Sequence, residues 1–218
     1  MRFFSYESRF SQLVLKISYA CCLNLLWFVC SLPIFTAGAA TTALYYASLK
    51  IIRDEESHVV AMFFRSFREN FRQATGIWLL LLGFGLFLAA DMYILFYLRA
   101  SSAGTMAVVW TLVLAAVIAV CIAYVIVLMY VFPLLASVSN TSLAMLKNAF
   151  LIGTHYLFAT ILVFAVHFAM FFAVVRIFTP LIIFGEGLCA MVSAWLLNSI
   201  LISVSYVPSD DDDGEDSP

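Results

Sequence analysis

The sequence predicts an all-α protein, a polytopic bundle of transmembrane helices with about six spans and an amphipathic interfacial helix. Hydrophobic residues make up 65% of the chain and charged residues only 11%, whereas a soluble domain carries roughly 25% charged residues. Runs of about 20 apolar residues recur, and each is long enough to cross about 30 Å of hydrocarbon as a helix. The alternating pattern of barrel strands is absent, so helices must satisfy the backbone in lipid.

The apolar runs define the predicted spans. They are Leu13–Leu32, Ile34–Ile52, Ala74–Leu98, Thr105–Ser137, Leu151–Val175 and Leu181–Val207. The second run is the least apolar, because it contains Thr36, Gly38 and Lys50. A short span, a re-entrant segment and an interfacial helix all remain open for it.

Basic residues favour the six-span arrangement, because Lys and Arg accumulate on the cytoplasmic side of a membrane. If Ile34–Ile52 does not span, the 11 basic residues divide almost evenly between the two sides. If it does span, nine lie on one side and only Arg99 and Arg176 on the other. We therefore expect a multi-pass protein of the cell membrane with both termini in the cytoplasm.

The fourth run is longer than one upright span, and Pro133 is expected to kink it or to end the span near the inner face. Ser139, Asn140 and Thr141 then have the composition of a helix N-cap. They predict a short cytoplasmic helix, Ser142–Phe150, ahead of the fifth span.

The chain is expected to form one domain, residues 1–207, followed by a disordered acidic tail, residues 208–218. That tail holds six acidic residues, and either a solvating or a binding role is compatible with it. The first apolar run is too long for a cleaved signal peptide. The cysteines make no CxxC pair and are interpreted as small core residues. They are Cys21, Cys22, Cys30, Cys121 and Cys189.

One polar segment interrupts the apolar pattern, and we call Lys50–Gln73 the polar island. It carries nine of the 24 charged residues. Three phenylalanines spaced four apart stack on one helical face, and three arginines lie on another. These residues are Phe63, Phe67 and Phe71, and Arg65, Arg68 and Arg72. The pattern predicts an amphipathic helix that either anchors in the headgroup layer or docks a cytoplasmic partner. Lipid explains the arginines better than nucleic acid does.

Three charged residues at membrane depth form a second candidate site. Asp91, Arg176 and Glu186 are expected near the outer leaflet, where they either form a ligand or ion site or pair between helices. His155 and His167 lie about 18 Å apart along a helix and cannot share a metal ion from one helix. The usual phosphate-loop, zinc-ligand and nucleophile motifs are absent, so we expect no enzyme activity, no catalytic residues, no metal and no cofactor.

Several short segments together resemble the N-terminal pattern of the YesL-like family of bacterial membrane proteins. They are NLLW at 24–27, SLP at 31–33, TAG at 36–38, TTALYY at 41–46 and FFRSFRENFRQ at 63–73. The resemblance covers about residues 1–80. It implies a protein without an established activity, often encoded beside carbohydrate uptake systems of Gram-positive bacteria.

The leading hypothesis is therefore a non-enzymatic accessory or regulatory component of carbohydrate uptake of the ATP-binding-cassette type. Its partners would be the lipid bilayer and other membrane subunits. One alternative is a transporter or channel for small solutes that acts alone, which needs polar residues along a path. Another is a lipid-interacting membrane scaffold without a small ligand.

Overall fold

The computed structural model describes residues 9–55, 58–177 and 182–205, and all regular structure in these ranges is helical. The elements are α1 (Arg9–Ser31), the 3₁₀ turn η1 (Ile34–Thr36), α2 (Ala37–Ile52), α3 (Val59–Ser101), α4 (Gly104–Ser137), α5 (Ser142–His155), α6 (Leu157–Arg176) and α7 (Ile182–Ser205). The expected all-α fold class is confirmed. The expected acidic tail lies outside the described residues.

Among the described residues, five helices are long and apolar enough to cross a membrane: α1, α3, α4, α6 and α7. The sixth expected span, Ile34–Ile52, is not one of them. Its helix α2 has 16 residues, about 24 Å, which is short of the roughly 30 Å of hydrocarbon. Eleven of those 16 residues are buried, because α2 packs against α1, α3, α4 and α7. Thr36, Thr42 and Ser48 in this run are therefore tolerated because they are buried in protein.

The contact between α2 and α3 is close because a glycine lies in it. A Cβ atom on Gly38 would lie 2.5 Å from the Cβ of Trp78 and 2.7 Å from the carbonyl oxygen of Ala74. The indole Nε1 of Trp78 donates to the carbonyl oxygen of Ile34 at 2.7 Å. The start of α2 is thereby fixed about five turns into α3.

The end of α2 returns the chain to the end of the bundle where α1 begins. The Lys16 ammonium lies 2.7 Å from the Asp54 carboxylate. The neighbouring Arg53 donates through Nε to Oδ1 of Asn198, near the end of α7, at 2.8 Å. The polar island therefore begins at the same end of the bundle as α1.

From Val59 onward, the polar island and the third apolar run form one unbroken helix rather than two. Helix α3 has 43 residues, about 65 Å, and contains no proline that would end or kink it. Its first part, Val59–Trp78, runs alongside α2 instead of lying beyond the end of α2. The amphipathic segment is therefore part of the bundle wall and is collinear with the apolar segment that follows it.

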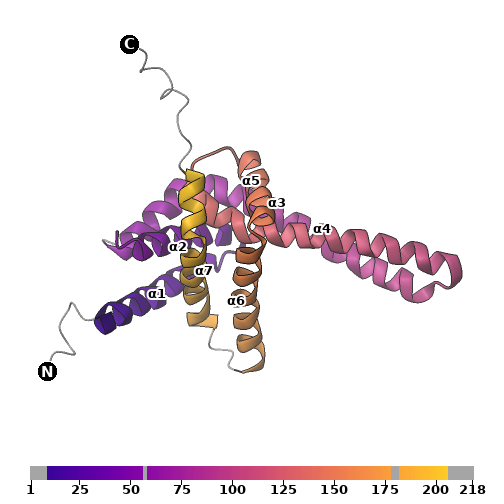
Figure 1. Cartoon of the computed structure of the whole chain (residues 1–218), viewed down its shortest axis with the longest axis horizontal. Coiled ribbons are helices and arrows are strands. Elements are labelled where there is room, and N and C mark those ends of the chain that lie inside the picture. The colour runs from indigo at the N-terminus through magenta and orange to yellow at the C-terminus, as the bar shows by residue number, and fades with distance from the viewer. Residues whose placement is uncertain (1–8, 56–57, 178–181, 206–218) are drawn as a thin grey trace, which may run out of the picture.

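The second part of α3 and the first part of α4 form a hairpin that projects from the rest of the molecule (Figure 1). Where the hairpin leaves the bundle, the hydroxyl of Tyr124 donates to the carbonyl oxygen of Leu81 at 3.0 Å. Large apolar side chains are exposed along both of its helices, including Leu86, Phe87, Ile94, Phe96, Val108 and Leu112. Helices α6 and α7 run across the direction of this hairpin (Figure 1).

The connection from α4 to α6 differs in part from the sequence prediction. Pro133 lies within α4, which continues to Ser137. Thr141 caps α5, as expected, through its side-chain oxygen and the backbone N–H of Ala144. Helix α5 extends beyond the expected end to His155, and the next helix begins after a break at Tyr156. The apolar run that was expected to be one fifth span is therefore divided between α5 and α6.

Candidate functional site

The first candidate site is the outer face of the polar island. The side chains of Arg65, Arg68 and Arg72 are exposed. Phe63 is fully buried, and Phe67 and Phe71 are partly buried against the core. The aromatic face was expected to contact the membrane or a partner. Phe63 instead belongs to the protein core, because α3 lies against α2 along this segment.

The arginines are weakly engaged within the protein. Arg65 lies 2.9 Å from Glu69, but both side chains are exposed, and such pairs contribute about 0–1 kcal/mol. Neither Arg68 nor Arg72 has an ion-pair partner among the described residues. A guanidinium that faces hydrocarbon is costly, so this face must meet water, lipid headgroups or another protein.

Charges at the start of the polar island pair with one another. Lys50 contacts Glu55, and this hydrogen bond and the positive charge lower the pKa of the Glu55 carboxyl. Together with the contact between Lys16 and Asp54, this pairing leaves the arginines as the open basic surface of the segment.

The second expected cluster is not assembled. Asp91 lies in the part of α3 that belongs to the hairpin with α4. Arg176 ends α6 with an exposed side chain. Within the described part of the chain, no ion pair joins either residue to Glu186. Glu186 faces His167 of α6 instead, with 3.8 Å between Oε1 and Nε2.

The backbone fixes which ring nitrogen of His167 carries hydrogen. Nδ1 lies 2.9 Å from the carbonyl oxygen of Val163, which can only accept, so Nδ1 is the donor. In the neutral ring Nε2 is then an acceptor. It faces a carboxylate oxygen, which is also an acceptor when ionised. Two acceptors cannot bond to each other. The two atoms are therefore satisfied only when one of them is protonated or when a hydrogen-bond donor from another group lies between them.

The pair lines a pocket of about 370 Å³ to which α2, α3, α4, α6 and α7 contribute. Besides Glu186 and His167, it is lined by Thr41, Tyr45, Trp78, Val125, Leu128, Met129, Phe132, Phe164, Phe168 and Phe171. Most of these side chains are aromatic or aliphatic, and Glu186 and His167 lie next to each other among them. Such a combination is typical of small-molecule sites. Sequence reasoning identified Glu186, but it did not identify His167 as its neighbour.

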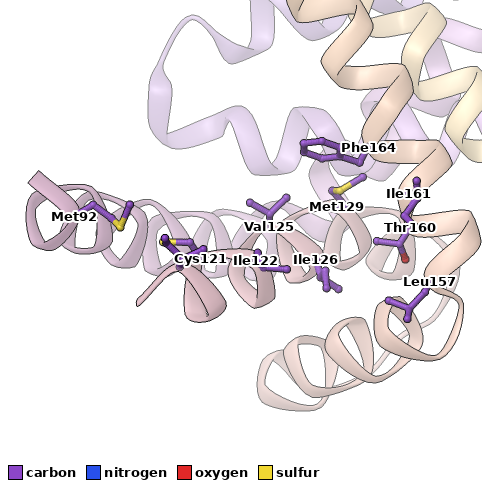
Figure 2. A pocket seen from close by; sticks show the side chains of 11 residues that line it. Met92, Cys121, Ile122, Val125, Ile126, Met129, Leu157, Thr160, Ile161 and Phe164 are labelled. Carbon is purple, nitrogen blue, oxygen red and sulfur yellow. The ribbon is translucent and has the colours of Figure 1, made fainter. Parts of the chain in front are cut away.

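An apolar groove of about 480 Å³ lies beside this pocket, where α4 meets α6. Figure 2 shows its lining of aliphatic, methionine and phenylalanine side chains, with Thr160 as the labelled residue that carries a side-chain oxygen. The Thr160 hydroxyl is already used, because it donates to the carbonyl oxygen of Gly153 at 2.7 Å. Val125, Met129 and Phe164 line both the groove and the pocket. The two cavities thus share one wall.

Metal-ligand geometry is not found among the described residues, where no three His, Cys, Asp or Glu side chains gather. The five cysteines are free thiols, and Cys189 is buried.

Residues 20–92 match a protein-family model described as "Protein of unknown function, DUF624". The match covers the second half of α1, all of α2 and most of α3, including the three arginines. It is compatible with the YesL-like resemblance, and the description of this family assigns no activity. No curated protein and no solved structure matches the chain.

Proposed function

We propose that this chain is a non-enzymatic accessory or regulatory component of a bacterial carbohydrate uptake complex of the ATP-binding-cassette type. Arg65, Arg68 and Arg72 would form its contact with the cytoplasmic part of that complex. The observation that carries the proposal is a row of exposed arginines on a helix whose opposite face is held in the core.

The arrangement suits a docking surface because the arginines are already positioned. Burial of Phe63 fixes the rotation of α3, so the row points outward without a further ordering cost on binding. Arg68 and Arg72 have no ion-pair partner among the described residues, which leaves their donors free for carboxylates. An acidic surface on a cytoplasmic or membrane subunit is the complementary partner. The YesL-like resemblance supports carbohydrate uptake as the setting.

Purification from native membranes tests the proposal. The tagged protein would be crosslinked, solubilised in mild detergent and analysed for co-purifying subunits. We expect permease or ATPase subunits to accompany the parent protein and to be lost when all three arginines are replaced by glutamine.

Arg99→Gln with Arg176→Gln is the matched control, because both residues lie outside the polar island. This control variant should retain the subunits. Recovery of the parent protein alone under crosslinking, or equal loss in the control, would contradict the proposal.

A stand-alone transporter is the second candidate, and the pocket around Glu186 and His167 is the observation that favours it. The separation of Asp91 from Glu186 weakens it, because a solute path would need polar groups in sequence across the membrane. Uptake of solute into proteoliposomes that contain the parent protein or Glu186→Gln distinguishes a transporter from an accessory protein. Uptake by the parent that is lost in the variant would favour transport, and no uptake would favour the accessory role.

A further inference from the structure

The pair of His167 and Glu186 is the strongest feature that the proposed docking function does not use. Both side chains are about 30% exposed and lie in the same pocket, so an incoming ligand can reach them. When His167 is neutral and Glu186 is ionised, the ring tautomer set by Val163 leaves two acceptor atoms 3.8 Å apart. A ligand group with at least two N–H donors can bond to both.

The charge of the site indicates a cation. An ionised Glu186 has no Lys or Arg within ion-pair distance among the described residues. The surrounding wall is mostly apolar, so a cationic ligand would compensate the carboxylate far more effectively there than in water. An ammonium group provides both the positive charge and the N–H donors.

The aromatic walls fit the same ligand. Phe164 and Phe168 are stacked with ring centroids 5.9 Å apart. Trp78 of α3 and Phe132 of α4 line the same pocket, and their ring centroids are 6.2 Å apart. Aromatic faces attract cations and accept apolar ligand bodies.

We infer that the pocket between α2, α3, α4, α6 and α7 binds a hydrophobic organic ammonium. The ammonium group donates to Oε1 of Glu186 and to Nε2 of His167. The apolar body lies against Phe164 and Phe168 and extends along the shared wall into the neighbouring groove (Figure 2). This inference is independent of the proposed docking function, because it uses none of the arginines.

The test compares three probes on the full chain in phosphatidylcholine nanodiscs, with empty nanodiscs as the baseline for partitioning. The probes are 2-phenylethylammonium, its N-trimethyl analogue, which keeps the charge without N–H groups, and neutral 2-phenylethanol. Isothermal titration should give the tightest binding for the primary ammonium and at least about tenfold weaker binding for the other two. Equal binding of either analogue, or no binding of the ammonium, would overturn the inference.

Two variants locate the site. Glu186→Gln should weaken binding of the primary ammonium by about tenfold or more, because a charged acceptor is lost. Asp91→Asn, which neutralises an acid on the projecting hairpin outside the pocket, should leave binding unchanged. An equal loss in both variants, or none in Glu186→Gln, would refute the assignment.

Folding of each variant is checked by gel filtration and thermal midpoint. If Glu186→Gln does not fold, photocrosslinking of the unmodified chain with an azidophenylethylammonium probe decides instead. Label on peptides that contain Phe164–Phe171 would support the site. Label confined to peptides from the tip of the hairpin, residues 97–112, would exclude it, because none of these residues lines the pocket or the groove.

Discussion

Gly187 shows how one residue determines the distance between two helices. Its backbone N–H donates to Oδ1 of the fully buried Asn24 at 2.6 Å. A Cβ at this position would lie 2.4 Å from the carbonyl oxygen of Ala20 and 2.8 Å from the Cβ of Asn24. Since a backbone carbonyl in a helix cannot move aside cheaply, a larger residue would have to separate α1 from α7.

We expect Gly187→Ala to destabilise the folded protein by about 1–3 kcal/mol, the usual cost of overpacking. Gly83→Ala is the matched control, because nothing lies within 4 Å of the added Cβ. That change should be neutral or stabilising by up to about 1 kcal/mol, through helix propensity. Denaturant unfolding of the detergent-solubilised protein measures both. A Gly187→Ala variant as stable as the Gly83→Ala control would show that α1 and α7 are not in this close contact.

The sequence was sufficient to identify residues that lipid would penalise, but not their partners. Asn24 lies within the first apolar run and is fully buried where α1 meets α7. Glu186 was expected to cluster with Asp91 and Arg176, as a ligand or ion site or as charge pairing between helices, because these charges share one predicted side of the membrane. Its observed neighbour is His167. Hydropathy sets the depth of a residue, whereas helix rotation and crossing direction determine which side chains meet.

At the scale of elements, α3 combines two segments that hydropathy had separated. The apolar segment and the arginine-rich segment differ in composition, yet nothing between them stops the helix. The periodicity of the phenylalanines correctly predicted one apolar face. It could not distinguish burial in lipid from burial in protein, because both environments select the same side chains.

Two adjacent phenylalanines test this distinction. Phe63 is 0% exposed and Phe64 is 38% exposed. Phe63→Ala should destabilise the protein by about 3–5 kcal/mol, as expected for a large cavity in a packed core. Phe64→Ala should cost much less, because part of that side chain already lies outside the core. Thermal midpoints of the two variants in the same detergent provide the comparison. Similar small losses for both would mean that the aromatic face contacts lipid.

At the scale of the whole molecule, the chain has a charged end and an apolar projection. The charged end is the end of the bundle that contains Lys16, Asp54 and Asn198. The projection is the α3–α4 hairpin, which has the turn at Ala103 at its tip. The length of α3, about 65 Å, is more than twice the hydrocarbon thickness of a bilayer. The two ends of this helix therefore have room to lie on opposite sides of a membrane.

We expect a cysteine at position 54 to react with a membrane-impermeant maleimide only from the cytoplasmic face. A cysteine at position 103 should react only from the opposite face. The measurement uses Asp54→Cys and Ala103→Cys in a background whose five native cysteines are replaced by alanine, in right-side-out and inverted vesicles. Labelling of both positions from the same face would contradict this orientation, and the background without cysteines should remain unlabelled.

The enclosure of α2 has a consequence for biogenesis. Of the four helices that surround it, α3, α4 and α7 are synthesised after it, and α7 is last. A chain emerging from the ribosome therefore carries α2, with its Thr42 and Ser48, before its surroundings exist. Insertion machinery or lipid must shelter this helix until α7 arrives. A chain that stops before α7 would leave part of α2 exposed. We expect membrane quality-control proteases to degrade such a chain.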